Sequence, residues 1–331
     1  MKTLTVVRSV LLALGVLCCV PLLAQNQPRI PVVLSTDVGN EIDDQWAIVY
    51  LLTNPAFDVK GVLSAHAPTI RPPAGRTAYN ILRHIVERRL NMVAHPPLFE
   101  GASEPLVNIH TPRASAAAKF LVTASKSFNA SRRLNVLTIG AVTDLASAIL
   151  DDPDIVNRIQ VVDMGFQDWP DGGDVFNIAN DIYAMQVVLD SNVPLVVGSE
   201  AVCKKGLAVS YEQARRMMGT RGPIGQWLWH EYQAWYYRVV KPWRKDDFSK
   251  PWVIWDNVTL AYLLGMTKQE IHPRPGLQDN LKFSHPDTDR KITWITEIDT
   301  PRFWADFLQK LDIYEATHIL PSEDDTGCGF L

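Results

Sequence analysis

The stretch LSTDVGNEIDD, Leu34 to Asp44, decides how this 331-residue chain folds. It follows an apolar run and precedes a helical pattern, which makes it the turn between a first strand and a first helix. In a parallel sheet such a turn lies beyond the carboxyl end of the strand, where ligands bind. The stretch therefore places four carboxylates at the predicted ligand edge of a sheet.

These acids allow two interpretations. Helix capping accounts for one of them, because an aspartate in a first helical turn accepts backbone N–H bonds and complements the helix dipole. Capping does not explain why Asp37 should face Asp43 and Asp44, since nearby carboxylates repel unless they share a proton or a cation. Oxygen-only ligands, a glycine at Gly39 that lets the turn bend, and the lack of a His/Cys cluster favour Ca²⁺ or Mg²⁺ over zinc.

Strand and helix patterns alternate outward from this turn. Apolar β-rich runs predict buried strands at Ile30 to Ser35, Val59 to Ala65, Leu134 to Ile139, Ile159 to Met164 and Val193 to Val197. Amphipathic or polar-capped stretches predict helices at Asp44 to Leu52, Ala74 to Arg89, Ala114 to Ser127, Thr143 to Leu150 and Asp181 to Asp190. The alternation predicts an α/β fold, a mostly parallel, open, doubly wound sheet with helices on both faces.

Three parts of the chain are expected. Residues 1–24 are predicted to be a secretory signal peptide, because Lys2 and Arg8 precede a short apolar run and Ala24 offers a small residue for cleavage. No repeat or flexible linker interrupts residues 25–320, so we expect one domain there and a polar C-terminal tail at 321–331. Within the domain, Ala201 to Arg244 is helical and aromatic-rich, which suggests a lid or a side layer.

Composition and charge exclude several classes of protein. Hydrophobic residues make up 47% and charged residues 21%, which is typical of a folded soluble protein. The formal net charge of -4 provides no basic field for nucleic acid. We expect an exported protein, periplasmic or secreted, that has no membrane association after signal cleavage; lipidation ranks lower because Leu17 precedes Cys18. Cleavage leaves Cys203 and Cys328, as a disulfide or as two free thiols.

A resemblance adds to these inferences. Asp37-Val38-Gly39-Asn40-Glu41-Ile42-Asp43-Asp44 resembles the aspartate-rich N-terminal signature of the inosine/uridine-preferring nucleoside hydrolase family. Later segments resemble family elements in the same order: Gly61 to Ala65, Asn80 to Glu104, Leu137 to Ala146 ("TGPLTNLA"), Met164-Gly165 with Phe176-Asn177-Ile178 and Asp181 ("MGG…EFNxxxDP"), and Trp255-Asp256 ("HDxxA"). The resemblance covers roughly Pro31 to Gly265, and the ordered set is more specific than any single motif.

The resemblance implies a nucleoside hydrolase-like fold and a set of functional residues. Calcium ligands fall on Asp37, Asp44, Asp256 and the backbone carbonyl of Ile139. Ribose-binding residues fall on Asp43 and Asn177, and Asp37 takes a proton from a metal-held water. The implied cofactor is Ca²⁺, and the implied partner is a small-molecule nucleoside or related ribosyl compound. Such chemistry is sensible, because a metal lowers the pKa of a bound water and carboxylates stabilise positive charge on the sugar.

Several departures from the family leave specificity open. The acidic turn is longer than the shortest family form, so Asn40 or Glu41 can enter the site. Trp255 stands where several members carry the histidine that protonates the leaving base. Val175 replaces a glutamate that helps to hold the ribose, and Ala67-Pro68 stands where Gly-Asn is frequent. Both the leaving-group acid and sugar recognition are therefore undetermined.

Three histidines are candidates for contact with the substrate. His66 follows the second strand, and it is either a proton donor of suitable pKa or a histidine hydrogen-bonded in a loop. His110 matches a family loop histidine only across compressed spacing. His230 lies in the aromatic run Trp227 to Tyr237, which either stacks on a base or packs into the core. We include His66, His230 and Trp255 among the predicted substrate-binding residues.

The sequence predicts calcium-dependent hydrolysis of the N-glycosidic bond of a ribonucleoside or related ribosyl compound. It lacks a phosphate-binding loop, a dinucleotide-binding glycine motif and a serine-hydrolase elbow. Two alternatives stay open: hydrolysis of another glycoside at the same metal site, and a secreted calcium-dependent sugar-binding protein without turnover. The preferred base and the oligomeric state are also open, a homo-oligomer being one option.

Overall fold

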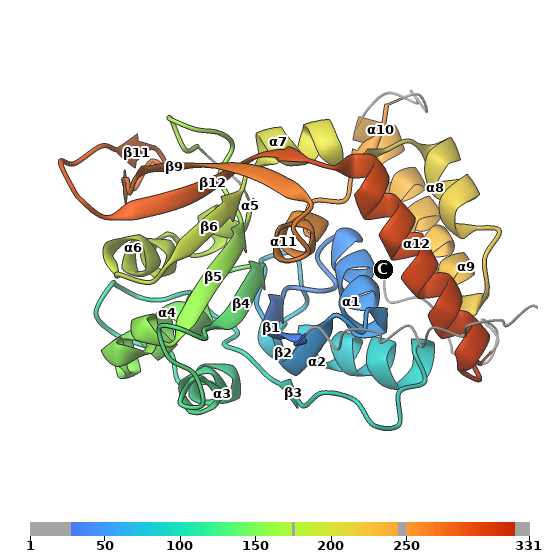
Figure 1. Cartoon of the computed structure of the whole chain (residues 1–331), viewed down its shortest axis with the longest axis horizontal. Coiled ribbons are helices and arrows are strands. Elements are labelled where there is room, and N and C mark those ends of the chain that lie inside the picture. The colour runs from blue at the N-terminus through green and yellow to red at the C-terminus, as the bar shows by residue number, and fades with distance from the viewer. Residues whose placement is uncertain (1–27, 174–175, 244–249, 322–331) are drawn as a thin grey trace, which may run out of the picture.

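An eight-stranded sheet forms the centre of the protein (Figure 1). The computed structural model describes residues 28–173, 176–243 and 250–321. The strands follow the order β3 (Leu98–Phe99), β2 (Phe57–Ser64), β1 (Ile30–Thr36), β4 (Leu134–Ile139), β5 (Ile159–Met164), β6 (Leu195–Gly198), β12 (Lys291–Ile298) and β9 (Thr267–Pro273). All neighbours pair in parallel except β9, which is antiparallel to β12. The predicted α/β fold with a mostly parallel sheet is confirmed.

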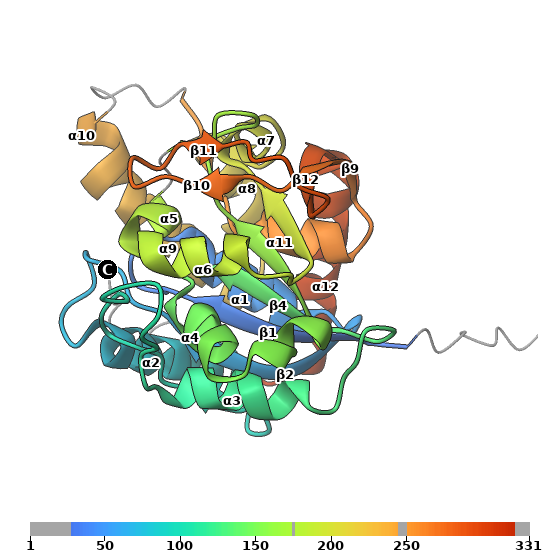
Figure 2. The same ribbon diagram turned by 90° about the vertical axis from the view of Figure 1, so that its left-hand side faces the viewer.

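Helices cover the two faces of this sheet (Figures 1 and 2). One face carries α1 (Asp43–Thr53) and α11 (Asn257–Leu263), and α2 (Ala74–His84) flanks β2 and β3 before it continues into the π-helical turn η1 (Ile85–Arg89). The other face carries α3 (Ala116–Ser125), α4 (Thr143–Asp151) and α6 (Ile182–Asp190), with the short elements η2 (Pro153–Asn157) and α5 (Phe176–Asn180) in the connections. The expected strands and helices therefore form, with ends displaced by at most a few residues.

The strand order fixes where a ligand can bind. The chain runs from β1 outward to β2 and β3, and then returns to β4 on the other side of β1. Such a reversal opens a crevice at the carboxyl ends of the two central strands. Thr36 pairs with Ile139 at this edge, so the turns after β1 and β4 leave the sheet side by side.

The aromatic-rich segment forms a side layer of helices. It contains α7 (Glu200–Gly206), α8 (Tyr211–Met218), α9 (Pro223–Trp235), η3 (Tyr236–Val240) and α10 (Lys241–Trp243), with the two-residue strand β7 (Ala208–Val209) paired to β8 (Trp252–Val253). Most of its aromatic rings are buried, among them Trp227, Trp229 and Tyr232. Core packing is thus the interpretation that the structure supports for these rings.

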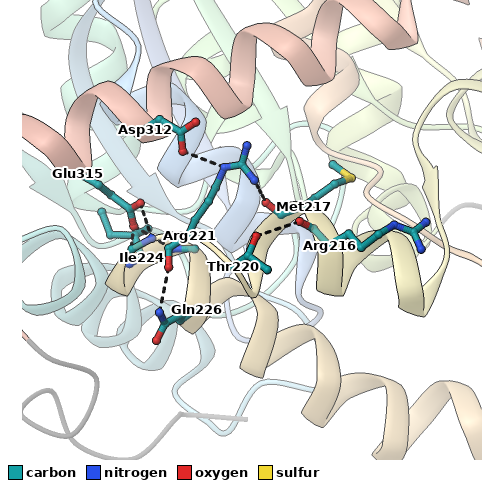
Figure 3. A network of polar contacts seen from close by, with 10 residues as sticks. Arg216, Met217, Thr220, Arg221, Ile224, Gln226, Asp312 and Glu315 are labelled. Carbon is teal, nitrogen blue, oxygen red and sulfur yellow. Dashed lines mark hydrogen bonds and ion pairs between the residues drawn. The ribbon is translucent and has the colours of Figure 1, made fainter.

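The C-terminal helix α12 (Thr300–Thr317) holds this side layer in place (Figure 3). Glu315 accepts backbone N–H bonds from Gly222, Ile224 and Gly225 at 2.8 to 3.0 Å, and so caps the start of α9. Arg221 forms an ion pair with Asp312 at 2.9 Å. These contacts join the turn between α8 and α9 to α12, because an anionic side chain at a helix N-terminus satisfies otherwise unpaired donors.

Helix α12 also packs on α1. Tyr50 stacks on Phe307 with ring centroids 4.6 Å apart, and its hydroxyl donates to Asp306 at 2.6 Å. Trp46 meets Phe307 edge-on at 6.1 Å. Burial of these large rings stabilises the helix whose first turn carries Asp43 and Asp44.

Part of the C-terminal third was not predicted. Strands β9 and β12, the hairpin β10 (Gly276–Leu277) with β11 (Phe283–Ser284), and α12 all lie beyond the last predicted strand. The expected signal peptide, Val175, Cys328 and residues 322–331 lie outside the described residues. Among the residues described, no helix combines the length and apolarity needed to cross a membrane.

Candidate active site

The site is built on the turn after β1. Gly39 has a φ of +105°, a backbone conformation that residues with a side chain rarely adopt. Glycine therefore lets the chain reverse here. Gly140, after β4, is equally constrained: a Cβ at this position would lie 2.9 Å from Cβ and Cγ of Asp37. The two glycines allow the turns after β1 and β4 to approach closely around the Asp37 carboxylate.

The acids of α1 do not serve as its cap. The N-cap residue is Ile42, and its side chain makes no capping hydrogen bond. Asp43 and Asp44 occupy the first turn, and Asp44 instead accepts a hydrogen bond from the Thr36 hydroxyl at the end of β1. Helix capping therefore does not account for Asp44. For Asp43, burial raises the pKa, and backbone N–H groups of the first turn lower it in opposition.

A third aspartate joins them from a distant part of the sequence. Asp256 stands at the start of α11, and one carboxylate oxygen of each of Asp43, Asp44 and Asp256 lies within 4.8 Å of the others. These three side chains and Asp37 are between 1% and 4% exposed. Oδ2 of Asp37 and Oδ2 of Asp256 are buried without a hydrogen-bond partner.

Burial and mutual repulsion act on all four carboxyl groups. Burial, followed by the charge of Asp43, raises the pKa of Asp37 well above its usual value, and burial with the neighbouring aspartates does the same for Asp44 and Asp256. Burial also raises the pKa of Asp43, to about 6. A divalent cation bound among these oxygens would remove the repulsion and supply the missing partners of the orphaned atoms. The donor set, all oxygen, fits a hard cation such as Ca²⁺.

The acids lie against a cavity of about 220 Å³. Its lining consists of carboxylates, aromatic rings and a few other side chains: Asp37, Asn40, Glu41, Asp43, Asp44, Ile139, Met164, Phe176, Asn177, Glu200, Trp252, Trp255 and Asp256. A mainly apolar wall with a few convergent polar groups is typical of a small-molecule site. The cavity stands at the strand reversal between β1 and β4, as the topology requires.

The structure gathers most of the predicted site residues around this cavity. The expected ligands Asp37, Asp44, Ile139 and Asp256 line it together with Asp43, Asn177 and Trp255. The Asn177 amide donates to the Met164 carbonyl at 3.2 Å, which fixes its position at the end of β5. Asn40 and Glu41, from the lengthened turn, also line the cavity, and Glu41 accepts a hydrogen bond from the Trp252 indole.

Two predicted substrate-binding residues, His66 and His230, do not line this cavity. His66 is buried beside Thr143, with 2.8 Å between Nε2 and Oγ1, and lines a neighbouring cavity that also includes Glu104. It follows β2, one strand away from the turn after β1 that carries Asp37. His230 is exposed on α9, because the buried side of that helix carries the aromatic rings. His110 lines yet another cavity, beside α4.

Four lining residues were not named as site residues from the sequence: Met164, Phe176, Glu200 and Trp252. Met164 and Phe176 belong to segments that carry the resemblance, so their positions could have been inferred. Glu200 comes directly after β6, at the ligand edge, and this position was its only signal. Cys203 is buried, and its thiol lies 3.6 Å from the Trp255 carbonyl.

Comparison with known proteins identifies the class to which this fold and this site belong. The family model described as "Inosine-uridine preferring nucleoside hydrolase" matches residues 32–305, and the chain belongs to this family. It is a hydrolase that acts on N-glycosyl bonds. Members of the family are metal-dependent, and the acidic cluster is compatible with that requirement.

Individual relatives are distant. The chain is 25% identical over 223 residues to a pyrimidine-specific ribonucleoside hydrolase, RihA, of Citrobacter koseri, which covers 59% of this chain and 67% of that protein. An uncharacterized protein of Schizosaccharomyces pombe is 23% identical over 195 residues, with 50% and 59% covered.

Solved structures share the fold. A plant nucleoside hydrolase, PpNRh1, superposes with a TM-score of 0.68 at 17% identity, over 86% of this chain and 99% of that one. A purine-preferring ribonucleoside hydrolase from Gardnerella vaginalis superposes with a TM-score of 0.67 at 16% identity, over 87% of this chain and 100% of that one. At these identities the likeness concerns the fold, while substrate preference rests on the cavity itself.

Proposed function

We propose that this protein hydrolyses the N-glycosidic bond of a ribonucleoside or related ribosyl compound in a calcium-dependent reaction. The observation that carries the proposal is the group of four buried aspartates, two with an orphaned oxygen, at the strand reversal and against a cavity. Asp37, Asp44, Asp256 and the carbonyl of Ile139 would hold the ion. Calcium, when bound, would orient a water and two sugar hydroxyls and would lower the pKa of that water.

The side chains of this cavity have separate tasks in the proposed reaction. Asp37 accepts a proton from the attacking water, whose oxygen forms the new bond to the anomeric carbon as the bond to the leaving nitrogen breaks. Asp43 and Asn177 bind sugar hydroxyls. The surrounding carboxylates stabilise the positive charge that develops on the ring.

The aromatic side of the cavity receives the leaving group. Phe176, Trp252 and Trp255 line the cavity with the acids, and a planar base packs well against such rings. The indole N–H of Trp255 is far too weak an acid to protonate a leaving base as the histidine of other family members does, so the reaction relies on leaving groups that depart without that histidine.

Base release from a panel of purine and pyrimidine nucleosides tests the proposal directly. The panel is run with added calcium, with a chelator and with calcium restored, and aryl ribosides and other aryl glycosides are included. We expect release from at least one riboside, lost with chelator and regained with calcium. Turnover of other glycosides alone would instead assign the second activity considered from the sequence. Sugar binding without any turnover would assign a binding protein.

We also propose export. The support is the predicted signal peptide at residues 1–24, with its basic start, short apolar run and Ala24. Expression of the full-length chain followed by N-terminal sequencing of the mature protein tests this. A first residue at Gln25 is expected, and an intact Lys2 in protein recovered from the cytoplasm would contradict it.

A further inference from the structure

Glu200 is a cavity-lining carboxylate to which the proposed reaction gives no task. It is the first residue of α7, directly after Ser199, whose side chain accepts from the Val202 N–H and caps the helix. Its side chain is 22% exposed, unlike the almost completely buried aspartates of the cluster. Glu200 therefore belongs to the cavity wall and not to the metal-binding group.

The position of Glu200 is fixed from three sides. Its backbone N–H donates to the carbonyl of Phe166 at 2.9 Å, and the next N–H, of Ala201, donates to Gln167 at 3.0 Å. Its carboxylate forms an ion pair with Lys204 one helical turn later. One turn along the same helix, the buried Cys203 thiol lies near the Trp255 carbonyl, so this side of α7 faces the Trp255 segment. A carboxylate held in this way loses little entropy when it binds a ligand.

Sheet register places Glu200 on the same side of the cavity as Asn177. Met164, the last residue of β5, pairs with Gly198 of β6, and Glu200 is two residues beyond Gly198. The Asn177 amide is bound to the carbonyl of that same Met164. Three strand spacings separate β1 from β6, which amounts to about 14 Å. The cavity thus has the acidic cluster at its β1 and β4 side, and Asn177 with Glu200 at its β5 and β6 side.

The geometry of a ribofuranoside matches this division. Its two ring hydroxyls lie together on one edge of the sugar, and the base and the exocyclic hydroxymethyl group leave the ring away from that edge, in different directions. When the ring hydroxyls face the acidic cluster and the base packs against Trp252 and Trp255, the remaining direction, toward β5 and β6, is left for the 5′-hydroxyl. We propose that Glu200 accepts a hydrogen bond from the 5′-hydroxyl and so determines specificity for that group, an inference that rests on the proposed function.

Matched substrate pairs test the role of Glu200. Inosine and uridine are compared with their 5′-deoxy analogues in the full-length protein with calcium, for wild type, Glu200→Ala and Glu200→Gln. A hydrogen bond to a charged acceptor predicts that wild type prefers the hydroxylated substrate by about 10- to 100-fold in kcat/KM. Glu200→Ala should lose that factor on the hydroxylated substrates and change kcat/KM on the 5′-deoxy substrates by less than about twofold.

The control is Glu212→Ala, which removes an exposed carboxylate of α8 paired with Arg215 and should leave the preference unchanged. Equal losses on both members of each pair would overturn the proposal in favour of a structural role. A change in discrimination between inosine and uridine, with the 5′-hydroxyl preference intact, would overturn it in favour of a contact with the base.

A binding measurement separates this proposal from the proposed activity. Calorimetry with methyl β-ribofuranoside and its 5-deoxy counterpart, in calcium, reports the same contact without turnover. If no nucleoside is cleaved but wild type still prefers the hydroxylated riboside and Glu200→Ala does not, the activity fails and the role of Glu200 stands. If neither riboside is bound and no substrate is cleaved, both proposals fall.

Discussion

Asp37 and Asp163 are both almost completely buried, and each has an Oδ2 atom without a hydrogen-bond partner. Asp37 follows β1, lines the cavity and lies among other carboxylates. Asp163 lies within β5, accepts a hydrogen bond from the Thr138 hydroxyl at 2.5 Å, and is not part of the cavity lining among the described residues. Burial alone raises its pKa, to about 7, against the opposing hydrogen bond from Thr138.

The difference between the two distinguishes the acid that we propose to be catalytic from a structural one. Burial raises the pKa of both groups, so a raised pKa does not identify the site. Of the two residues, only Asp37 lies at the cavity among repelling carboxylates, an arrangement that is compatible with a bound cation. A proton suffices for Asp163, because a single buried carboxyl becomes neutral when it binds one.

The largest effect that separates these two residues concerns turnover. Asp37→Asn removes the proposed proton acceptor and should lower kcat by about 10²- to 10⁴-fold in base release. Asp163→Asn should keep kcat within about threefold of wild type. Circular dichroism confirms that both variants are folded. A folded Asp37→Asn variant with full activity would contradict the proposed reaction.

The second effect concerns the pH dependence of stability, and here the variant of Asp163 is the one that should differ from wild type. The pKa of Asp163 is about 7 in the folded protein, against 3.8 when exposed, so the folded state binds the proton more tightly. The stabilisation of the folded state by this proton is intact below pH 3.8. It is lost as the pH rises through 7, by about 4 kcal/mol at most. Asp163→Asn has no such titration. The difference in free energy of unfolding, Asp163→Asn minus wild type, should therefore increase from pH 4 to pH 8. Urea denaturation at constant calcium measures it.

An unchanged difference between wild type and Asp163→Asn across this pH range would contradict the prediction. The acids of the cavity titrate in both proteins, so their contribution cancels in the comparison. Asp152→Asn is a suitable control, because this residue is an ion-paired carboxylate near the surface.

The third effect concerns the ion. Calcium at 100 times its dissociation constant should stabilise the folded state by about 2.7 kcal/mol, because the site exists only in that state. A chelator should lower Tm of wild type and of Asp163→Asn by several degrees. Asp256→Asn should lose most of this calcium-dependent shift. Equal shifts in wild type and Asp256→Asn would remove Asp256 from the ligand set.

The sequence predicted the parts of the fold that have a local signal. Strands β4 and β5 form as predicted, residue for residue, because each is a short, mostly apolar run in which all residues but one are buried. Strand β9 gives no such signal, since nearly all of its residues are partly or fully exposed at the sheet edge. Helix α12 did carry one: Phe303, Phe307 and Leu311 recur at helical spacing and are fully buried.

The prediction of the site likewise depended on whether a residue has a local signal in the sequence. The acidic turn identified Asp37, Asp43 and Asp44 on physical grounds, because their spacing in one loop makes repulsion unavoidable. Asp256 lies more than 200 residues later, and only resemblance to a family placed it with them. Glu200 was missed, because a lone glutamate after a strand looks like any helix start until sheet register shows which strand ends beside it.

The smallest effect tests the neighbouring cavity, which has no task in the proposed reaction. The Thr143 hydroxyl donates to Asp181 at 2.6 Å and lies 2.8 Å from His66 Nε2, so it joins two buried polar groups. Thr143→Val should lower the free energy of unfolding by about 1–2 kcal/mol. It should leave kcat/KM within about twofold, because His66 does not line the acidic cavity. Thr143→Ser, which keeps the hydroxyl, should restore most of the stability. A tenfold loss of kcat/KM in Thr143→Val at unchanged Tm would show instead that the His66 cavity takes part in the reaction, and the distinction between the two cavities would fail.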